Sequence, residues 1–373
     1  MLKFPDKFYW GTATSAYQVE GGIKNDWSAA GPRFNAGMAC DHYHRFEEDF
    51  DLAQQMNNNA HRFSIEWARI EPEEGKFDQL EIEHYRKVIL ALKARNLEPF
   101  VTLYHWTLPI WFAEKGGWLN KEAPEYFARF VEKVVSEYKD LVKFWITLNE
   151  PNIYSSISYL KGNWPPFGKS WRKAQKVFNQ LTKAHINAYQ IIHKISLNLQ
   201  VGIALNNIWY RGIAKLFVDY KWNHWFLKKI KNYQDFIGLN YYSSYSLGRL
   251  IFNNGEKNDL GWLITPEGIY HVLKALKKYQ KPIYITENGL ADAKDKKRAK
   301  FIIDHLQWVH KVMEQGIDVR GYFHWSLLDN FEWDKGFAPR FGLIEINYNN
   351  LQRIPRPSSK VYAEICQNNG LNI

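Results

Sequence analysis

Cysteine is scarce in this 373-residue sequence, which has only Cys40 and Cys366 and no second cysteine near either of them. The scarcity excludes a disulfide-stapled scaffold and a cysteine-rich zinc module, and it is typical of proteins in a reducing compartment. No apolar run is long enough to span a bilayer, and the first residues contain no long apolar segment. We therefore expect a cytoplasmic protein without a membrane partner.

Several common sequence motifs are also missing. The sequence has no Gly-x-Ser-x-Gly, His-Glu-x-x-His or Gly-x-Gly-x-x-Gly, which excludes the usual serine-hydrolase, zinc-protease and dinucleotide-binding sites. His42 and His44 have a spacing that could bind a metal, but no third ligand lies nearby in the sequence, so packing is the preferred interpretation. We expect neither a metal nor any other cofactor.

Positive charge and aromatic rings, by contrast, are abundant. Lysine and arginine number 49 against 39 acidic residues, so the formal net charge is +10. Short lysine runs such as 294–300 predict a solvated surface and no nucleic-acid partner, with polyanion binding as the alternative. Aromatic residues make up 16% of the chain, which suits a site that stacks against flat, partly apolar ligands.

Short β-rich runs alternate with helical patterns along the whole chain. The helical pattern is clearest at 81–95, 124–138 and 299–315, and the link 208–235 leaves space for one short helix and little else. Most of the β-rich runs are nearly continuously apolar, as expected for strands covered on both faces. This alternation predicts an α/β protein with a single (β/α)₈ barrel domain over residues 1–373, and a doubly wound sheet is the less favoured alternative. The predicted strands are 8–14, 61–67, 99–105, 142–149, 201–207, 236–242, 282–287 and 319–326.

Acids, amides and indoles gather at or just beyond the carboxyl ends of these strands. In a (β/α)₈ barrel the carboxyl ends form the face where chemistry is carried out. Amides and carboxylates bind hydroxyls, and indoles cover apolar ring faces, so this rim predicts a pocket for a polyhydroxylated ring. We expect Glu66 to pair with a neighbouring arginine, with support of the pocket floor as the alternative, and Asp329 to be a structural loop acid. The other residues of the rim are Gln18, Glu20, Trp67, His105, Trp106, Asn149, Glu150, Tyr241, Tyr242, Glu287, Asn288, Trp325, Glu332 and Trp333.

Two of these residues form a candidate catalytic pair. Glu150 and Glu287 each end a predicted strand, before Pro151 and before Asn288-Gly289. Cleavage of a glycosidic bond with retention requires two carboxyls about 5 Å apart, one as an acid and one as a nucleophile. At that distance the two charges repel by roughly 3 kcal/mol, so one glutamate should keep its proton near neutral pH. Metal binding and loop capping are the alternative roles for such acids.

Six motifs, in this order over nearly the full chain, resemble those of glycoside hydrolase family 1. Segments 8–21, 61–64 and 104–106 read Phe-Tyr-Trp-Gly-Thr-Ala-Thr-Ser-Ala-Tyr-Gln-Val-Glu-Gly, His-Arg-Phe-Ser and Tyr-His-Trp. Segments 147–151 and 285–289 read Thr-Leu-Asn-Glu-Pro and Ile-Thr-Glu-Asn-Gly, and 325–333 reads Trp-Ser-Leu-Leu-Asp-Asn-Phe-Glu-Trp.

The resemblance implies a retaining β-glycosidase with Glu150 as acid/base and Glu287 as nucleophile. Asn149 would hold the sugar 2-hydroxyl, and Trp325 would lie under the ring. Arg62 and Tyr242 would keep Glu287 ionised, with Asn240 as a further supporting residue. The remaining sugar contacts implied by the family motifs are Gln18, His105, Trp106, Glu332, Trp333 and Phe341.

Departures from the family pattern narrow the expected substrate. The branch that acts on 6-phosphosugars has serine, lysine and tyrosine where Glu332, Pro339 and Phe341 stand, so a neutral sugar is expected. Shorter links after strands four, five and six than in most members predict an open site for the leaving group. The expected activity is exo-hydrolysis of small β-glucosides, and also of β-galactosides or β-fucosides. The alternatives are transfer of the glycosyl group to a sugar or lipid acceptor, and sugar binding without catalysis.

Overall fold

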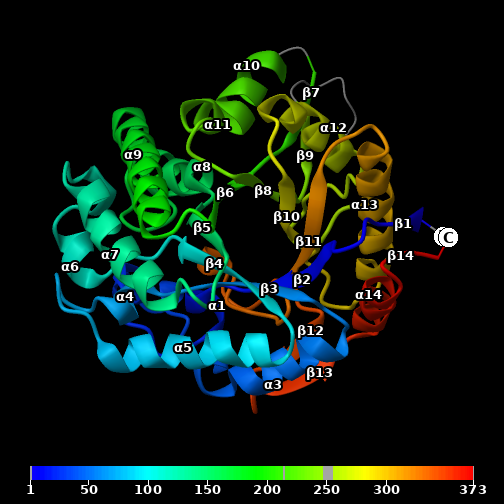
Figure 1. Ribbon diagram of the computed structural model, residues 1–373, viewed down its shortest axis with the longest axis horizontal. Coiled ribbons are helices and arrows are strands. Elements are labelled where there is room, and N and C mark those ends of the chain that lie inside the picture. Colours follow the sequence, from blue (N-terminus) through cyan, green and yellow to red (C-terminus); the bar gives the residue numbers. More distant parts are fainter. Residues whose placement is uncertain (1, 213–214, 247–254, 373) are drawn as a thin grey trace.

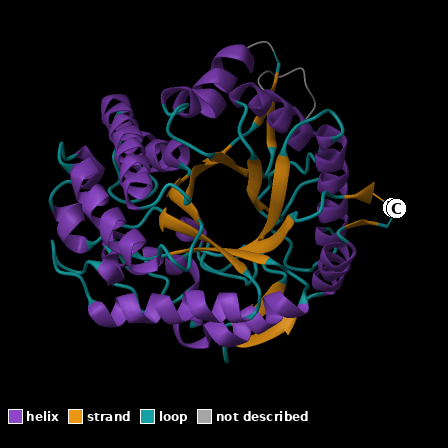
Figure 2. Ribbon diagram, in the orientation of Figure 1, coloured by secondary structure: helices purple, strands orange, loops and turns teal. Residues whose placement is uncertain are grey.

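The computed structural model describes residues 2–212, 215–246 and 255–372. At its centre, eight parallel strands form a closed barrel in the order β10-β11-β2-β3-β4-β5-β6-β8, with helices around the outside (Figures 1 and 2). The predicted (β/α)₈ barrel is therefore confirmed, and every predicted strand is present, with limits that differ from the predicted ones by no more than three residues. The barrel strands are β2 (Tyr9–Ala13), β3 (Ala60–Ser64), β4 (Glu98–Tyr104), β5 (Phe144–Asn149), β6 (Gln200–Asn206), β8 (Phe236–Asn240), β10 (Ile283–Asn288) and β11 (Val319–Trp325).

The helices outside the barrel cover the strands with apolar stripes. In α7 (Ala123–Tyr138), which covers the predicted helical range 124–138, the apolar residues at helical spacing, among them Phe127, Phe130 and Val134, are buried. The start of α5 is fixed by Asp78, whose carboxylate accepts hydrogen bonds from the first backbone N–H groups of the helix. The other long helices are α3 (His42–Gln55), α5 (Gln79–Ala94), α9 (Trp171–Ile195), α12 (Glu267–Leu276), α13 (Arg298–Met313) and α14 (Pro357–Asn368).

Shorter elements lie mainly in the links at the ends of the barrel strands. The short helices are α1 (Ala16–Val19), α2 (Asp26–Ala29), α4 (Trp67–Ile70), α6 (Ile110–Glu114) and α8 (Pro151–Tyr154). The short strands are β1 (Leu2–Lys3) with β14 (Gly370–Leu371), β7 (Trp209–Arg211) with β9 (Ser244–Ser246), and β12 (Ile344–Asn347) with β13 (Gln352–Pro355). Because β1 pairs with β14, the two ends of the described chain lie side by side (Figure 1).

Aromatic rings fill the inside of the barrel. Phe100 and Phe144 stack with their ring centroids 4.2 Å apart, and Phe236, Tyr284 and Phe323 complete the layer. Gly202 makes this packing possible, because a Cβ atom there would lie 2.4 Å from the Phe236 ring. The interior is therefore a packed core, and the space for a ligand lies at the end of the barrel.

The link 208–235 holds more structure than its length predicts. It contains β7 and a continuous helical segment, α10 (Lys215–Asp219), a π-helical stretch Tyr220–His224, and α11 (Trp225–Lys229). The expectation of one short helix and little else was therefore wrong, because these elements pack on α9 and against β9.

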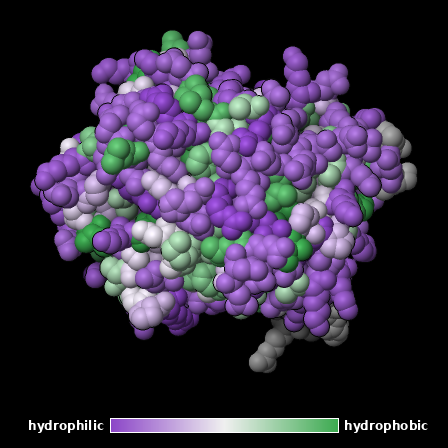
Figure 3. All heavy atoms as spheres, turned by 90° about the horizontal axis from the view of Figure 1, so that it is seen from below, coloured by the Kyte–Doolittle hydropathy of each residue, from purple (hydrophilic) through white to green (hydrophobic). Residues whose placement is uncertain are grey.

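No helix in the described part of the chain is both long enough and apolar enough to cross a membrane. On the side of α5, the surface is mostly hydrophilic, with apolar residues scattered among the polar ones (Figure 3).

Candidate active site

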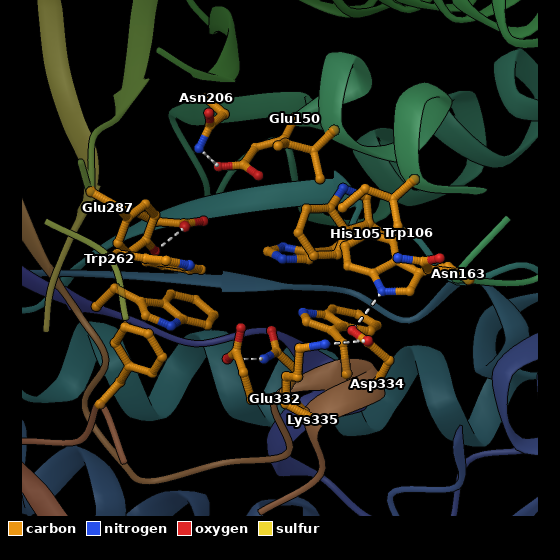
Figure 4. A pocket seen from close by; sticks show the side chains of 18 of the residues that line it. His105, Trp106, Glu150, Asn163, Asn206, Trp262, Glu287, Glu332, Asp334 and Lys335 are labelled. Atoms are coloured by element: carbon orange, nitrogen blue, oxygen red, sulfur yellow. Dashed lines mark hydrogen bonds and ion pairs between the residues drawn. The ribbon is translucent and has the colours of Figure 1, made fainter. Parts of the chain in front are cut away.

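A cavity of about 420 Å³ lies at the carboxyl ends of the barrel strands. Its volume is in the range of small-molecule sites. Figure 4 shows the carboxyl groups of Glu150 and Glu287 extending into it from different elements. The predicted residues that line it are Gln18, His105, Trp106, Glu150, Tyr242, Glu287, Trp325, Glu332, Trp333 and Phe341.

Three predicted residues, Arg62, Asn149 and Asn240, are fully buried and do not line the cavity. Arg62 donates from Nη2 to Asn149 Oδ1 at 2.7 Å, and Asn240 donates to the same oxygen at 3.1 Å. Because Oδ1 of Asn149 accepts both bonds, its Nδ2 is the atom that faces His105 Nε2, at 3.1 Å. These residues therefore form a polar layer beneath the cavity that orients the side chains above it.

Glu287 is held by a cation and a phenol. Arg62 Nη1 donates to Oε1 at 2.5 Å, and Tyr242 Oη donates to Oε2 at 2.6 Å. Burial raises the pKa of this carboxyl, while Arg62 and Tyr242 oppose the rise because both stabilise the anion. The predicted ion pair between Arg62 and Glu287 is present in the structure.

Glu150 is held by two amides instead. Asn240 Nδ2 and Asn206 Nδ2 donate to its Oε1 at 2.8 and 3.3 Å. Its backbone is left-handed (φ 44°), just before the proline that begins α8. Burial, and next the charge of Glu287, raise the pKa of Glu150 to about 8. At neutral pH the Glu150 carboxyl therefore keeps a proton that it can give away.

The histidine and indole at the end of β4 are fixed by the same network. Burial and the nearby Arg62 keep the pKa of His105 well below its ordinary value, so its ring is neutral and Nε2 can accept from Asn149. Trp106 donates from its indole to the Asn149 carbonyl at 2.8 Å. Both side chains are thus held from below and present their rings to the cavity.

Gln18 and Glu332 lie together at the opposite wall. Gln18 Nε2 lies 3.5 Å from Glu332 Oε2 and is also bonded to Asn330 and the Phe331 carbonyl. Burial, and next the charge of Glu287, raise the pKa of Glu332 to about 8. This wall offers amide and carboxyl groups for hydroxyls, whereas Trp325 and Phe341 supply apolar surface.

The glycine after the predicted nucleophile has a steric role. A Cβ atom on Gly289 would lie 1.8 Å from the carbonyl oxygen of Trp325. The Asn-Gly sequence after Glu287 therefore allows β10 and β11 to approach closely where the site is built.

Two of the rim acids have structural partners. Glu66 accepts from Thr107 Oγ1 at 2.9 and 3.0 Å and from Asn25 at 3.4 Å, so its predicted arginine pairing was wrong. Arg69 pairs with Glu20 instead, at 2.8 Å. The buried carboxylate of Asp329 accepts hydrogen bonds from Arg340, Arg356 and two backbone N–H groups, as expected for a structural acid.

Sequence reasoning missed some cavity residues. Asn206 ends β6 and contacts Glu150, so the strand-end criterion could have found it. Trp262 lies in the link between β9 and α12 and faces the rings of Tyr242 and Phe341, and only its aromatic character distinguished it in the sequence. Ile153 and Ile157 line the cavity from α8 and the π-helical stretch that follows it.

The two closely spaced histidines both bind carboxylates. His42 Nδ1 lies 2.7 Å from Asp49, and His44 Nδ1 lies 2.6 Å from Asp41. Across the described ranges, no group of three or more histidine, cysteine, aspartate or glutamate residues is arranged to hold a metal ion.

Known proteins are similar to this chain in sequence and structure over its full length. A 1,4-beta-D-glucan glucohydrolase of Thermotoga neapolitana is 34% identical over 442 aligned positions, covering 100% of both chains. Beta-glucosidase A of Thermotoga maritima is 33% identical, covering 99% of each chain. The structure of a beta-glycosidase from Pyrococcus horikoshii matches with a TM-score of 0.93 and 39% identity, over 100% of this chain and 96% of that one.

The alignment with the T. neapolitana enzyme also shows how short this chain is. The alignment spans 442 positions, whereas this chain has 373 residues. At least 69 aligned positions (442 minus 373) therefore have no counterpart in this chain. Residues 1–220 and 223–371 match the model described as glycosyl hydrolase family 1. The chain therefore belongs to glycosyl hydrolase family 1.

Proposed function

We propose that this protein is an exo-acting, retaining β-glycosidase that removes terminal β-D-glucosyl residues and also accepts β-galactosyl and β-fucosyl residues. Membership of family 1 makes it a glycoside hydrolase of the β-glucosidase type, and the proposal adds the mechanism, the residue roles and the sugars. One observation carries it. Glu150 and Glu287 line one cavity, and their hydrogen-bond partners differ in the way that an acid and a nucleophile require.

In the first step, Glu287 attacks the anomeric carbon while the bond to the aglycone oxygen breaks. Glu150 gives its proton to that oxygen, so the leaving group departs as a neutral alcohol. In the second step, Glu150, now a carboxylate, takes a proton from water as the water attacks the same carbon. The bond to Glu287 breaks, and the sugar leaves with its original β configuration.

The sugar is held from below and from one side. Gln18, His105, Glu332 and Trp333 bind its hydroxyls, and Trp325 lies against its apolar face, with Phe341 as a less specific lining residue. Trp106 gives its indole N–H to the Asn149 carbonyl, so it contacts the sugar only through its ring. The amide of Asn149 has two hydrogens, of which His105 takes one, so the second can reach the 2-hydroxyl. Arg62, Tyr242 and Asn240 orient the catalytic pair.

The rest of the proposal concerns the whole chain. Residues 1–373 would act as one barrel domain in the cytoplasm, with an open aglycone side that accepts mixed aglycones. Hydrolysis is the expected main reaction, because the relatives are named as glucosidases and glucohydrolases. Transfer to another acceptor has no comparable support.

The nucleophile can be tested by trapping the intermediate. An activated 2-deoxy-2-fluoro-β-glucoside should inactivate the enzyme with one label per chain, on the peptide that contains Glu287. Glu287→Gln is the matched control and should remain unlabelled, and Glu287→Gly should abolish turnover of aryl β-glucosides. A label on another residue, or an α-anomer as the first product in NMR spectra, would overturn the proposal.

A further inference from the structure

A second hollow lies beside the catalytic cavity and has no part in the proposed mechanism. The helical segment 151–161 separates the two, with Ile153 and Ile157 on the catalytic side and Ser156 and Leu160 on the other. The second groove has a volume of about 240 Å³ and lies between this segment, α9 and the helical segment 215–229. Its apolar lining residues are Leu160, Trp171, Ala174, Phe178, Val218, Trp222 and Trp225.

Large apolar side chains are exposed around this groove. Among the described residues, thirteen large apolar side chains are exposed, and five of them belong to the three segments that line it. Leu216 is 84% exposed, Phe217 70% and Trp171 61%, and Leu160 and Tyr220 are exposed to a smaller extent. We call these five residues the apolar rim. Leu160 and Trp171 line the groove itself, and the Phe217 ring lies 5.9 Å from Nζ of Lys221, which also lines it, so apolar exposure is gathered beside the groove.

The positive charge of the protein is concentrated in the same part of the chain. Residues 151–234 contain 13 lysines and arginines and a single acid, Asp219, for a net charge of +12. Since the whole chain carries +10, the remainder is slightly negative at −2. The basic excess therefore lies within residues 151–234, the stretch of chain that includes the three segments of the groove.

The cations lie directly against the aromatic rings of this face. Lys221 Nζ is 4.3 Å from the ring centroid of Trp225, and Lys228 Nζ is 5.6 Å from that of Tyr220. Within the described part of the chain, neither lysine has a carboxylate within 4 Å, and the same holds for Arg172 and Lys173 at the start of α9. These charges are therefore available for an external anionic partner.

We propose that the apolar rim and its lysines dock on an anionic lipid surface. Surface helices bind in the interfacial region of a bilayer through leucine, phenylalanine and tryptophan side chains that lie next to lysines. The apolar side chains would enter the interface, the lysines would meet anionic headgroups, and the groove would accept part of an acyl chain. The sequence-based expectation of no membrane partner rested on the absence of a spanning segment, and docking of this kind needs none.

Lipid is favoured over nucleic acid by the kind of side chain exposed. Leu216 cannot stack on a base, yet it is among the most exposed apolar residues of the described chain. The partner must therefore offer apolar volume together with negative charge. Bilayers with anionic lipids do so, and the cytoplasmic leaflet is the anionic one.

Vesicle sedimentation with the full chain tests the proposal. The protein should bind vesicles made of equal parts phosphatidylcholine and phosphatidylglycerol, and binding should weaken as salt is added. The double variant Leu216→Ser/Phe217→Ser should lose roughly tenfold or more of the partition coefficient, because the apolar contribution disappears. Lys221→Gln/Lys228→Gln should lose roughly thirtyfold of the partition coefficient, given the usual contribution of each lysine near an anionic surface.

Matched controls separate docking from general surface effects. Leu80 and Leu197 are each 81% exposed, away from the groove, so Leu80→Ser/Leu197→Ser should bind vesicles as the wild type does. Lys294→Gln/Lys296→Gln removes two exposed charges from the other lysine-rich run, with little expected loss. Every variant should keep wild-type hydrolysis of nitrophenyl β-glucoside, because none of these residues lines the cavity. A failure of the catalytic proposal would therefore be seen separately.

Three results would overturn the docking proposal. The first is no partition of the wild type into anionic vesicles. The second is equal binding by the rim variant and the Leu80/Leu197 control. The third is tight binding to duplex DNA that depends on Lys221 and Lys228 but not on Leu216 and Phe217, which would assign this face to a polyanion.

Discussion

Arg62 donates a 2.5 Å hydrogen bond to Oε1 of Glu287, and both side chains are buried beside the cavity. Glu150 has amide donors in the corresponding positions, from Asn206 and Asn240. A guanidinium stabilises a carboxylate much more than an amide does, so the structure makes the two glutamates unequal. Double displacement needs this inequality, because one carboxyl must start protonated and the other ionised.

Replacing the acid/base should slow the two steps unequally. We expect Glu150→Ala to form the glycosyl intermediate from a dinitrophenyl β-glucoside at a rate near that of the wild type, because this leaving group needs no proton. Hydrolysis of the intermediate should then be roughly 10²–10⁴-fold slower, since the water has lost its base. Azide needs no base and should restore turnover, with β-glucosyl azide as the product.

Stopped-flow release of dinitrophenol would show a burst followed by the slow step. A matched Glu287→Ala variant should show neither the burst nor production of the β-azide. Near wild-type steady-state rates for Glu150→Ala would show that the acid/base had been assigned to the wrong residue.

The pH dependence of kcat/KM should depend on the pKa of Glu150 and on the hydrogen bond that Glu150 accepts from Asn206. Because Glu150 must be protonated in the first step, kcat/KM should fall as the pH rises through about 8. The Asn206 hydrogen bond lowers the pKa of Glu150. Asn206→Ala should therefore move the alkaline fall of kcat/KM to higher pH, by roughly half a unit. Trp222 donates to Oδ1 of Asn206, so Trp222→Phe should move it in the same direction by less.

Trp171→Phe is the control for the tryptophan substitution, because Trp171 lines the neighbouring groove and does not contact Asn206. This substitution should leave the pH at which kcat/KM falls unchanged. A shift to lower pH in Asn206→Ala would contradict the assigned hydrogen bond.

Glu66 should link stability to pH. Burial raises its pKa from 4.5 to about 7, so the folded protein holds the proton more tightly than the unfolded chain. The stabilisation is fully present below about pH 4.5 and is lost as the pH rises through about 7. Glu66→Gln removes this titration. Between pH 4 and pH 8 the unfolding free energy of the variant should therefore rise relative to the wild type by about 3 kcal/mol.

Urea unfolding at several pH values measures this difference. Glu132→Gln, at an exposed position on α7, is the control for the substitution itself. A constant difference between Glu66→Gln and the wild type over this pH range would mean that Glu66 titrates alike in both states.

Gly289→Ala should damage both stability and the site. The new Cβ would overlap the carbonyl of Trp325, so the backbone beneath the proposed sugar platform must shift. We expect a loss of roughly 1–3 kcal/mol in unfolding free energy, together with a higher KM for glucosides. Gly255→Ala is the matched control, because the nearest atom there is the end of the Leu263 side chain, at 3.3 Å. Thermal unfolding and initial rates would show whether the two variants differ as expected.

The sequence predicted the barrel because its signals are local and repeated. Most strands are short, nearly continuous apolar runs, such as Phe144–Asn149, and the long helices have apolar stripes of their own. The link 208–235 was misjudged for the opposite reason. β7 exists only because it pairs with β9, and a pairing partner more than thirty residues away leaves no mark on a three-residue strand.

The candidate site, too, could be predicted only in part. Strand-end position alone identified Glu150, Glu287, His105 and Trp325, because a parallel barrel brings all carboxyl ends to one face. The partners of several groups could not be read from the chain. Glu66 was assigned an arginine but bonds Thr107, which is 41 residues away in the sequence and comes close to it only in the fold.

By itself, then, the order of residues determined the barrel, the face that carries chemistry and the two glutamates, because periodicity and strand ends are encoded within a few neighbouring positions. Only the tertiary structure decided that Asn206 and Asn240 hold Glu150, and that Lys221 lines an apolar groove beside the cavity. Those properties depend on distances across the fold, and the electrostatic energy of a buried pair is set by such distances and by burial.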